Sequence, residues 1–177
     1  FVKGRVTLSP SSEVLTGQVE VAIPVPAGTT TIPFWLFPNR LSKPSARFDD
    51  TNLHHHFPDG FQPGHMRVEA PTMRGCPEGA WGRSLRPGVR ELRLSQPVGE
   101  AQVCHIGIAY EVKVPRRFGP FGVVDDVMTL DGGFFPRPAP LRSFAIEGGA
   151  VPAPIQWEFE LENDADDPIS VGVNGRL

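Results

Sequence analysis

Apolar and polar residues alternate along most of this chain, which is the pattern of half-buried β-strands. In residues 15–23, for example, every second position is apolar or glycine, and the positions between them are mostly polar. No window of ten or more residues shows a convincing helical period, so we expect no long helix. The runs that predict strands are 2–8, 15–23, 30–37, 66–70, 90–95, 101–114, 155–161 and 169–173.

Turn sequences separate these runs. Gly, Pro, Asn and Asp gather between the apolar segments, as in PDG at 58–60 and NDADD at 163–167. Strands with one apolar and one polar face favour antiparallel pairing. The pattern therefore predicts an all-β fold of about eight or nine strands, as a two-layer, mostly antiparallel β-sandwich or saddle-shaped sheet. A length of 177 residues fits a single domain, 1–177.

Alternation also predicts which side chains face the core. In the longest run, 101–114, the even positions from Cys104 to Val114 are apolar and predict a buried face. In the run 155–161 the expected core residues are Ile155, Trp157, Phe159 and Leu161.

Charge argues against two classes of partner. Only 21% of the residues are charged and the net charge is −3, which gives no electrostatic case for nucleic acid or for an anionic membrane. No apolar run approaches the ~20 residues that span a bilayer. The chain begins with Phe1 rather than Met, so we expect a processed or cut piece, and its compartment is left open.

Two cysteines, Cys76 and Cys104, leave two possibilities. They form one bridge if the protein is exported, or they are two free thiols. The second possibility is favoured because Cys104 lies on an apolar strand face, where a free cysteine behaves as a small hydrophobic residue.

The histidine run in NLHHHFPDG, residues 52–60, raises the question of a metal. Its flanks are rich in turn residues, and no neighbouring Asp or His completes a zinc-ligand spacing. We expect His54, His55 and His56 to lie in a solvated loop. Sequences of the types GxSxG, CxxC and HExxH are absent, so we expect no catalytic, cofactor-binding or metal-ligating residue in this chain.

The segment FFPRPAP, residues 134–140, is the most distinctive part of the chain. Three prolines at alternate positions impose an extended path with little entropy left to lose on docking. One interpretation is a rigid connection packed over the sheet. The other is a contact with a neighbouring domain, made by Phe134, Phe135, Pro136, Arg137 and Pro138.

Six motifs, in order, resemble a known domain. They are LTGQVEVAI at 15–23, LFPNRL at 36–41, PGHMRVEAPTMRG at 63–75, YEVKVPRRFGPFG at 110–122, FFPRPAPLRS at 134–143 and WEFELENDADDPISVGVNG at 157–175. Together they resemble the N-terminal β-domain of the aminopeptidase N-like gluzincin zinc metallopeptidases, the family that includes leukotriene hydrolase. The resemblance runs over nearly the whole chain.

The resemblance implies a role without chemistry. In that family the zinc, the HExxH pair and the third glutamate ligand belong to the following catalytic domain, and none of these motifs occurs here. The resemblance thus implies a non-catalytic domain whose partner is the C-terminal catalytic domain of the same parent protein, with zinc only in that absent domain. The family's substrate-contacting "Gln–x–x–x–Ala–Arg" motif has no match in FFPRPAPL, so no substrate-binding residue is transferred. This departure indicates a divergent, bacterial-type branch or a relative without peptidase activity.

Three functions follow from the sequence. The first is the non-catalytic N-terminal domain of an aminopeptidase-like zinc metallopeptidase, which would cap the catalytic domain and shape substrate access. The second is a stand-alone β-sandwich binding or adhesion module. The third is a small metal-dependent enzyme that uses the histidine run, and it ranks last because the ligand spacing does not fit.

Overall fold

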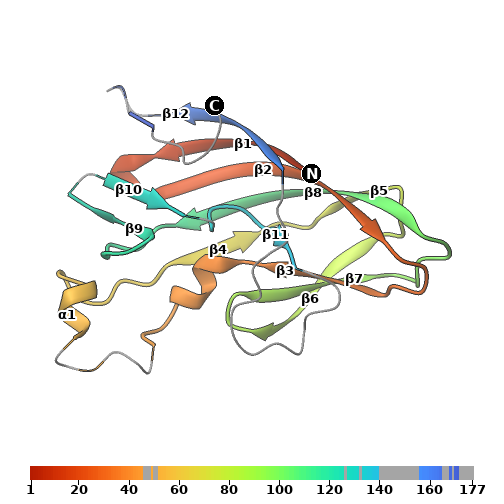
Figure 1. Cartoon of the computed structure of the whole chain (residues 1–177), viewed down its shortest axis with the longest axis horizontal. Coiled ribbons are helices and arrows are strands. Elements are labelled where there is room, and N and C mark those ends of the chain that lie inside the picture. The colour runs from red at the N-terminus through yellow and green to blue at the C-terminus, as the bar shows by residue number, and fades with distance from the viewer. Residues whose placement is uncertain are drawn as a thin grey trace.

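A computed structural model describes residues 1–45, 49, 52–125, 127–131, 133–139, 156–164, 168, 170 and 171. Its largest sheet has six strands, and five of them follow the order β12-β1-β2-β8-β4, with β5 also paired to β8 (Figure 1). Among the described strand pairs of this sheet, β1 and β12 run parallel and all the others run antiparallel. The strands are β1 Val2–Ser9, β2 Val14–Val25, β4 His65–Val68, β5 Thr72–Arg74, β8 Gln102–Lys113 and β12 Trp157–Asn163.

A second sheet of four strands, ordered β11-β3-β7-β6, forms the other layer. Its strands are β3 Thr31–Trp35, β6 Gly79–Arg86, β7 Val89–Leu94 and β11 Arg137–Pro138. A separate hairpin joins β9 Phe121–Val124 to β10 Val127–Leu130. The helical pieces of the described chain are short: η1 Pro10–Ser12, η2 Phe37–Leu41 and α1 Leu53–His56.

One hydrophobic core lies between the two sheets, because each contributes its apolar face to the same cluster. The fold is therefore an all-β, mostly antiparallel sandwich, as alternation predicts. On β8 the even positions are buried and the odd positions are more exposed, so the predicted facing of this strand is confirmed. Fully buried members of the core include Val6, Leu15 and Ile106 from the large sheet and Ile32, Phe34 and Leu92 from the small one.

Two glycines on the inner face of the large sheet make room for aromatic rings. Gly17 lies opposite Tyr110, and a Cβ built on it would stand 2.6 Å from the Tyr110 Oη atom. Gly4 lies opposite Phe159, and its Cβ would stand 2.8 Å from a ring carbon of that residue. A Cβ would also stand 2.8 Å from the Arg5 carbonyl oxygen at Gly17 and 2.6 Å from the Gln18 carbonyl oxygen at Gly4, so a larger residue fits only if both ring and backbone shift.

The structure corrects several expectations. The described residues contain twelve strands rather than eight or nine, because the expected runs leave out the short β5, β9, β10 and β11 and the irregular β6. The histidine run forms the single helical turn α1 rather than a loop, although all three side chains are exposed, as expected.

Two further expectations concern the C-terminal part. Leu161 is exposed rather than buried, because β12 is the edge strand of the large sheet and no further strand of the described chain covers its outer side. Phe159, on the same face, is half-buried and packs against the core. The expected strand at 169–173 lies mostly outside the described residues, as do Ile155 and the side chain of Trp157.

Candidate functional site

The predicted contact segment, Phe134 to Pro138, crosses between the two sheets. At its end, β11 pairs with β3, and the Ala139 amide donates a hydrogen bond to the Pro33 carbonyl over 2.8 Å. This makes β11 the terminal strand of the four-stranded sheet in the described chain. Proline suits such a position because an edge strand does not need every N–H donor.

The two phenylalanines of this segment have different environments. Phe135 lies in the core with 3% of its surface exposed, whereas Phe134 is half-buried. Their ring centroids are 4.9 Å apart, and both rings also contact Phe159, at 5.1 Å for Phe134 and 4.8 Å for Phe135. Phe135 is thus committed to this domain's core, and Phe134 is the ring that retains exposed surface.

The remaining members of the predicted contact are partly covered as well. Pro136 is buried, and Arg137 and Pro138 are half-buried. Burial lowers the pKa of the Arg137 guanidinium from its ordinary value. The accessible part of the segment is therefore Phe134 with the outer surface of β11.

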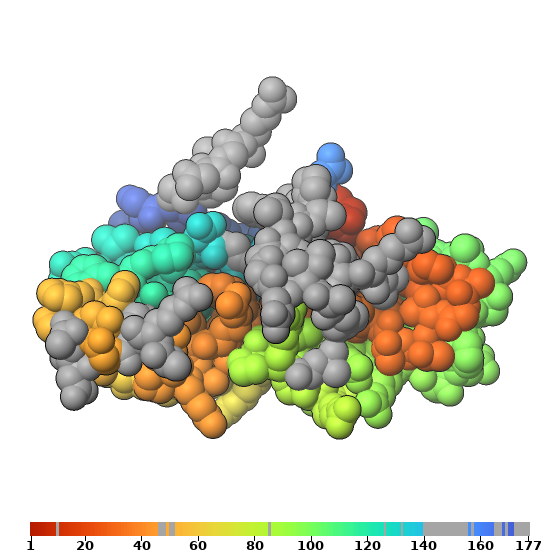
Figure 2. All heavy atoms as spheres, turned by 60° about the horizontal axis from the view of Figure 1, so that its bottom comes forward, coloured from red at the N-terminus to blue at the C-terminus, as the bar shows by residue number. Residues whose placement is uncertain are grey.

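The histidine run lies at one end of the molecule, beside the chain that leads into β9. The Phe118 amide donates a hydrogen bond to the His56 carbonyl over 2.9 Å, and the Arg117 guanidinium lies 5.4 Å from the centre of the Phe57 ring. The space-filling view shows these two parts of the chain against each other (Figure 2). Phe57 is 1% exposed, so this phenylalanine anchors the turn to the rest of the domain.

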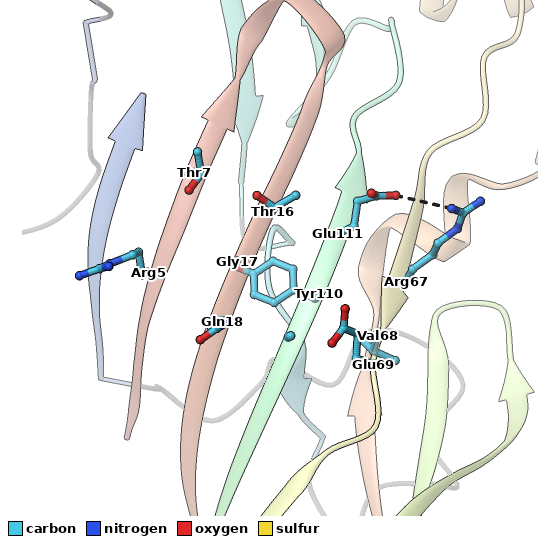
Figure 3. A pocket seen from close by; sticks show the side chains of 11 residues that line it. Arg5, Thr7, Thr16, Gly17, Gln18, Arg67, Val68, Glu69, Tyr110 and Glu111 are labelled. Atoms are coloured by element: carbon cyan, nitrogen blue, oxygen red, sulfur yellow. Dashed lines mark ion pairs between the residues drawn. The ribbon is translucent and has the colours of Figure 1, made fainter. Parts of the chain in front are cut away.

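A shallow hollow of about 560 Å³ lies on the outer face of the large sheet (Figure 3). Charged and polar side chains from four neighbouring strands and the residue after β4 line it, and the Arg67 guanidinium pairs with the Glu111 carboxylate over 3.7 Å. Charges of both signs meet there, which gives the hollow no strong preference for anions or cations. Lining residues include Arg5, Thr7, Gln18, Arg67, Glu69 and Glu111.

Glu13 is a buried carboxylate within the described chain, at the tight turn between η1 and β2. Lys113 Nζ lies 3.1 Å from its Oε2 atom, and Arg116 Nε donates a short hydrogen bond to its Oε1 atom. Burial raises the pKa of Glu13, but the hydrogen bonds from Arg116 and Lys113 outweigh it, so that the pKa is lowered overall. This paired cluster ties the β1–β2 connection to the end of β8.

Cys76 and Cys104 are both free thiols in the structure, which agrees with the favoured alternative. Cys104 is fully buried, and Cys76 is half-buried and packs against the same core. Burial, together with the interaction with the Cys76 sulfur, raises the pKa of the Cys104 thiol to about 12. Both side chains thus belong to the same apolar cluster.

Zinc in proteins requires a set of His, Cys, Asp or Glu ligands that meet at one point. Within the described ranges, no three residues of the types His, Cys, Asp or Glu are grouped so that they would hold a metal ion.

No helix in the described part of the chain is long and apolar enough to cross a membrane. The predicted docking residues share one segment, whereas the histidines lie elsewhere.

Sequence reasoning missed the Glu13 cluster, the outer hollow and the proximity of the cysteines. Glu13 gives one usable signal, since an isolated acidic residue just before an alternating run is a candidate for a turn. Its partners, Lys113 and Arg116, are a hundred residues away, and only the pairing of β2 with β8 brings them close.

No protein-family model matches the sequence, and no curated protein matches it either. Solved structures that resemble the fold are M1 zinc metallopeptidases, each with 15% sequence identity to this chain. A crystal structure of the enzyme from Deinococcus radiodurans has a TM-score of 0.41, with 64% of this chain and 20% of that chain covered.

Two further structures are mutants with bound ligands. A two-domain M1 zinc metallopeptidase bound to L-tryptophan has a TM-score of 0.41, with coverage of 67% and 21%. The Deinococcus radiodurans enzyme bound to a Tyr-Ser-Ala substrate has a TM-score of 0.42, with coverage of 70% and 23%. The chain spans less than a quarter of the length of each of these structures.

Proposed function

We propose that this chain is the non-catalytic N-terminal domain of an aminopeptidase-like zinc metallopeptidase. In this role it caps a catalytic domain, which is not part of this sequence, and shapes the access of substrates to it. The observation that carries the proposal is the ordered set of six motifs. The structure adds a physical reason to treat them as one set, because motif residues far apart in the sequence contact one another.

The side-chain amide of Asn39 joins the second and third motifs, because it forms the hydrogen bonds that a neighbouring strand would otherwise form. Asn39, from LFPNRL, accepts a hydrogen bond from the Met66 amide over 2.7 Å and donates one to the Met66 carbonyl over 3.1 Å. Met66 belongs to PGHMRVE at the start of β4. The asparagine side chain therefore acts as a short piece of backbone at the sheet edge.

The first and fourth motifs meet through Gly17 and Tyr110, where the glycine leaves room for the ring. The second and fourth motifs are in contact through Phe37 and Phe121, whose ring centroids are 5.6 Å apart. Motifs that matched by chance would not be expected to contact one another at their matching residues. These contacts support a shared structural unit, and the capping role is proposed from the place of that unit in the resembling family.

In this proposal zinc belongs to the absent catalytic domain, where it would supply Lewis-acid activation of water for peptide hydrolysis. The described residues of this chain take no part in that chemistry. Their contribution is a surface, and the half-buried Phe134 beside β11 is the element that we assign to the contact with the catalytic domain. An aromatic ring next to a proline-restrained strand loses little entropy on docking.

The contact can be tested by Phe134→Ser in the full product of the gene. We expect faster proteolysis at the domain junction, and a smaller fall in the melting temperature of the isolated β-domain than Phe135→Ser causes, because Phe134 is only half-buried. Phe118→Ser is a matched control, because this ring is 46% exposed and lies beside α1 instead of β11. Equal proteolysis of the two variants would rule out the assigned contact.

The outer hollow favours a second candidate, the stand-alone binding module. Its polar lining would suit a ligand with several hydrogen-bonding groups, such as an oligosaccharide or an extended peptide. The reading frame that encodes this chain separates the two candidates. A downstream HExxH with a later glutamate supports the first, and its absence, together with ligand binding that Gln18→Ala weakens, supports the second.

A further inference from the structure

The strand β5 brings the two cysteines to the same place. β5 pairs with β8 in antiparallel register, with Met73 opposite Ile106 and Arg74 opposite His105. The next step of this register sets Gly75 opposite Cys104. Because Met73 and Ile106 share the inner face, alternation directs the Gly75–Cys104 position inward as well.

Gly75 leaves this inward position empty. It has no side chain, and its φ of +72° turns the chain out of the strand. A Cβ there would stand 2.9 Å from the Val103 carbonyl oxygen, so the two backbones are close. The next residue, Cys76, packs against the core cluster that contains Cys104. The missing side chain at Gly75 therefore leaves room between Cys76 and Cys104.

We propose that Cys76 and Cys104 are a disulfide-forming pair, which links the segment entering β6 to the central strand β8. The cross-link would close a loop that contains β6 and β7 of the small sheet, since these strands lie between the two cysteines in the sequence. This inference is independent of the proposed capping role.

The exposure of the two thiols sets the order of the reaction with a small disulfide oxidant. Cys104 is 0% exposed, so the oxidant reaches only Cys76. The Cys76 thiolate attacks one sulfur of the oxidant, the oxidant's S–S bond breaks, and its first thiolate leaves. Cys104 then attacks the Cys76 sulfur and expels the second thiolate.

The protons of the two cysteines pass, through solvent, to the two thiolates that leave. Two protein thiols are oxidised to one disulfide, and one small disulfide is reduced to two thiols. The pairing of β5 with β8 supports this second step, because it places the resolving Cys104 beside the chain that carries Cys76.

The test uses the full chain with oxidised glutathione, followed by mass spectrometry under denaturing, non-reducing conditions. We expect the wild type to lose two hydrogen atoms and to carry a Cys76–Cys104 peptide link. Its melting temperature should rise by about 5–10 °C, since the link closes a loop of about 30 residues in the unfolded chain.

Two variants separate the steps. Cys104→Ala removes the resolving thiol and should accumulate one glutathione adduct at Cys76, whereas Cys76→Ser should not react while folded. The proposal is overturned if the wild type stops at an adduct, joins a second copy or does not react. It is also overturned if the internal link lowers the melting temperature, because the bond would then not fit the native fold.

Discussion

At the scale of single residues, two positions carry functions in the fold that their types alone do not reveal. Gly17 interrupts the apolar face of β2, and alternation alone predicts only that this position faces the core. In the structure the Tyr110 ring packs directly against the Gly17 backbone. Glu13 likewise reads as a surface charge, yet it is 6% exposed and held by two cations.

Gly17→Ala should lower the free energy of unfolding by about 1–3 kcal/mol, because the added methyl group overlaps Tyr110 and the Arg5 carbonyl oxygen. Gly99→Ala is the matched control, since a Cβ there meets nothing within 4 Å. Urea unfolding of both variants checks this prediction. Equal stabilities would show that the ring moves aside without cost.

Glu13→Gln should cost about 1–3 kcal/mol at pH 7, because it leaves Lys113 and Arg116 without their counter-charge. The pKa of Glu13 is lowered in the folded state from its ordinary 4.5, so its contribution is present above about pH 4.5. That contribution is lost as the pH falls through the folded-state pKa. The stability difference between wild type and variant should therefore narrow at pH 3, and a constant difference would contradict the assigned charge pairing.

At the scale of elements, alternation predicted the long strands well and the short ones poorly. β1, β2 and β8 alternate over eight or more residues, so one buried face is unambiguous. β6 has the sequence GAWGRSLR and two register irregularities, and no period of two can be read from it. The turn α1 was missed because four residues are too few to show a helical period.

Replacing His54, His55 and His56 together with Asn should change the free energy of unfolding by no more than about 0.5 kcal/mol, as is usual for exposed sites. Phe57→Ala, in the next position, should cost about 3–5 kcal/mol because this ring is fully buried. Thermal unfolding compares the two. A large loss in the triple variant would show that the histidines hold more than a solvated turn.

At the scale of the whole molecule, the sequence was sufficient for the fold class, but not for the contacts between distant parts. The pairing of Cys76 with Cys104, the Glu13 cluster and the outer hollow all depend on strand order. Strand order here includes a parallel β1–β12 pair that joins the two ends of the described chain. Local pattern contains no information about such a pairing.

Zinc content, measured on this chain and on the full product of its gene, tests the proposed role most directly. After treatment with a chelator and repurification in zinc-containing buffer, this chain should retain no stoichiometric zinc, because its described residues form no ligand set. The full product should bind one zinc ion per molecule and release it to the chelator. Stoichiometric zinc in this chain alone, or a full product that binds none, would contradict the account.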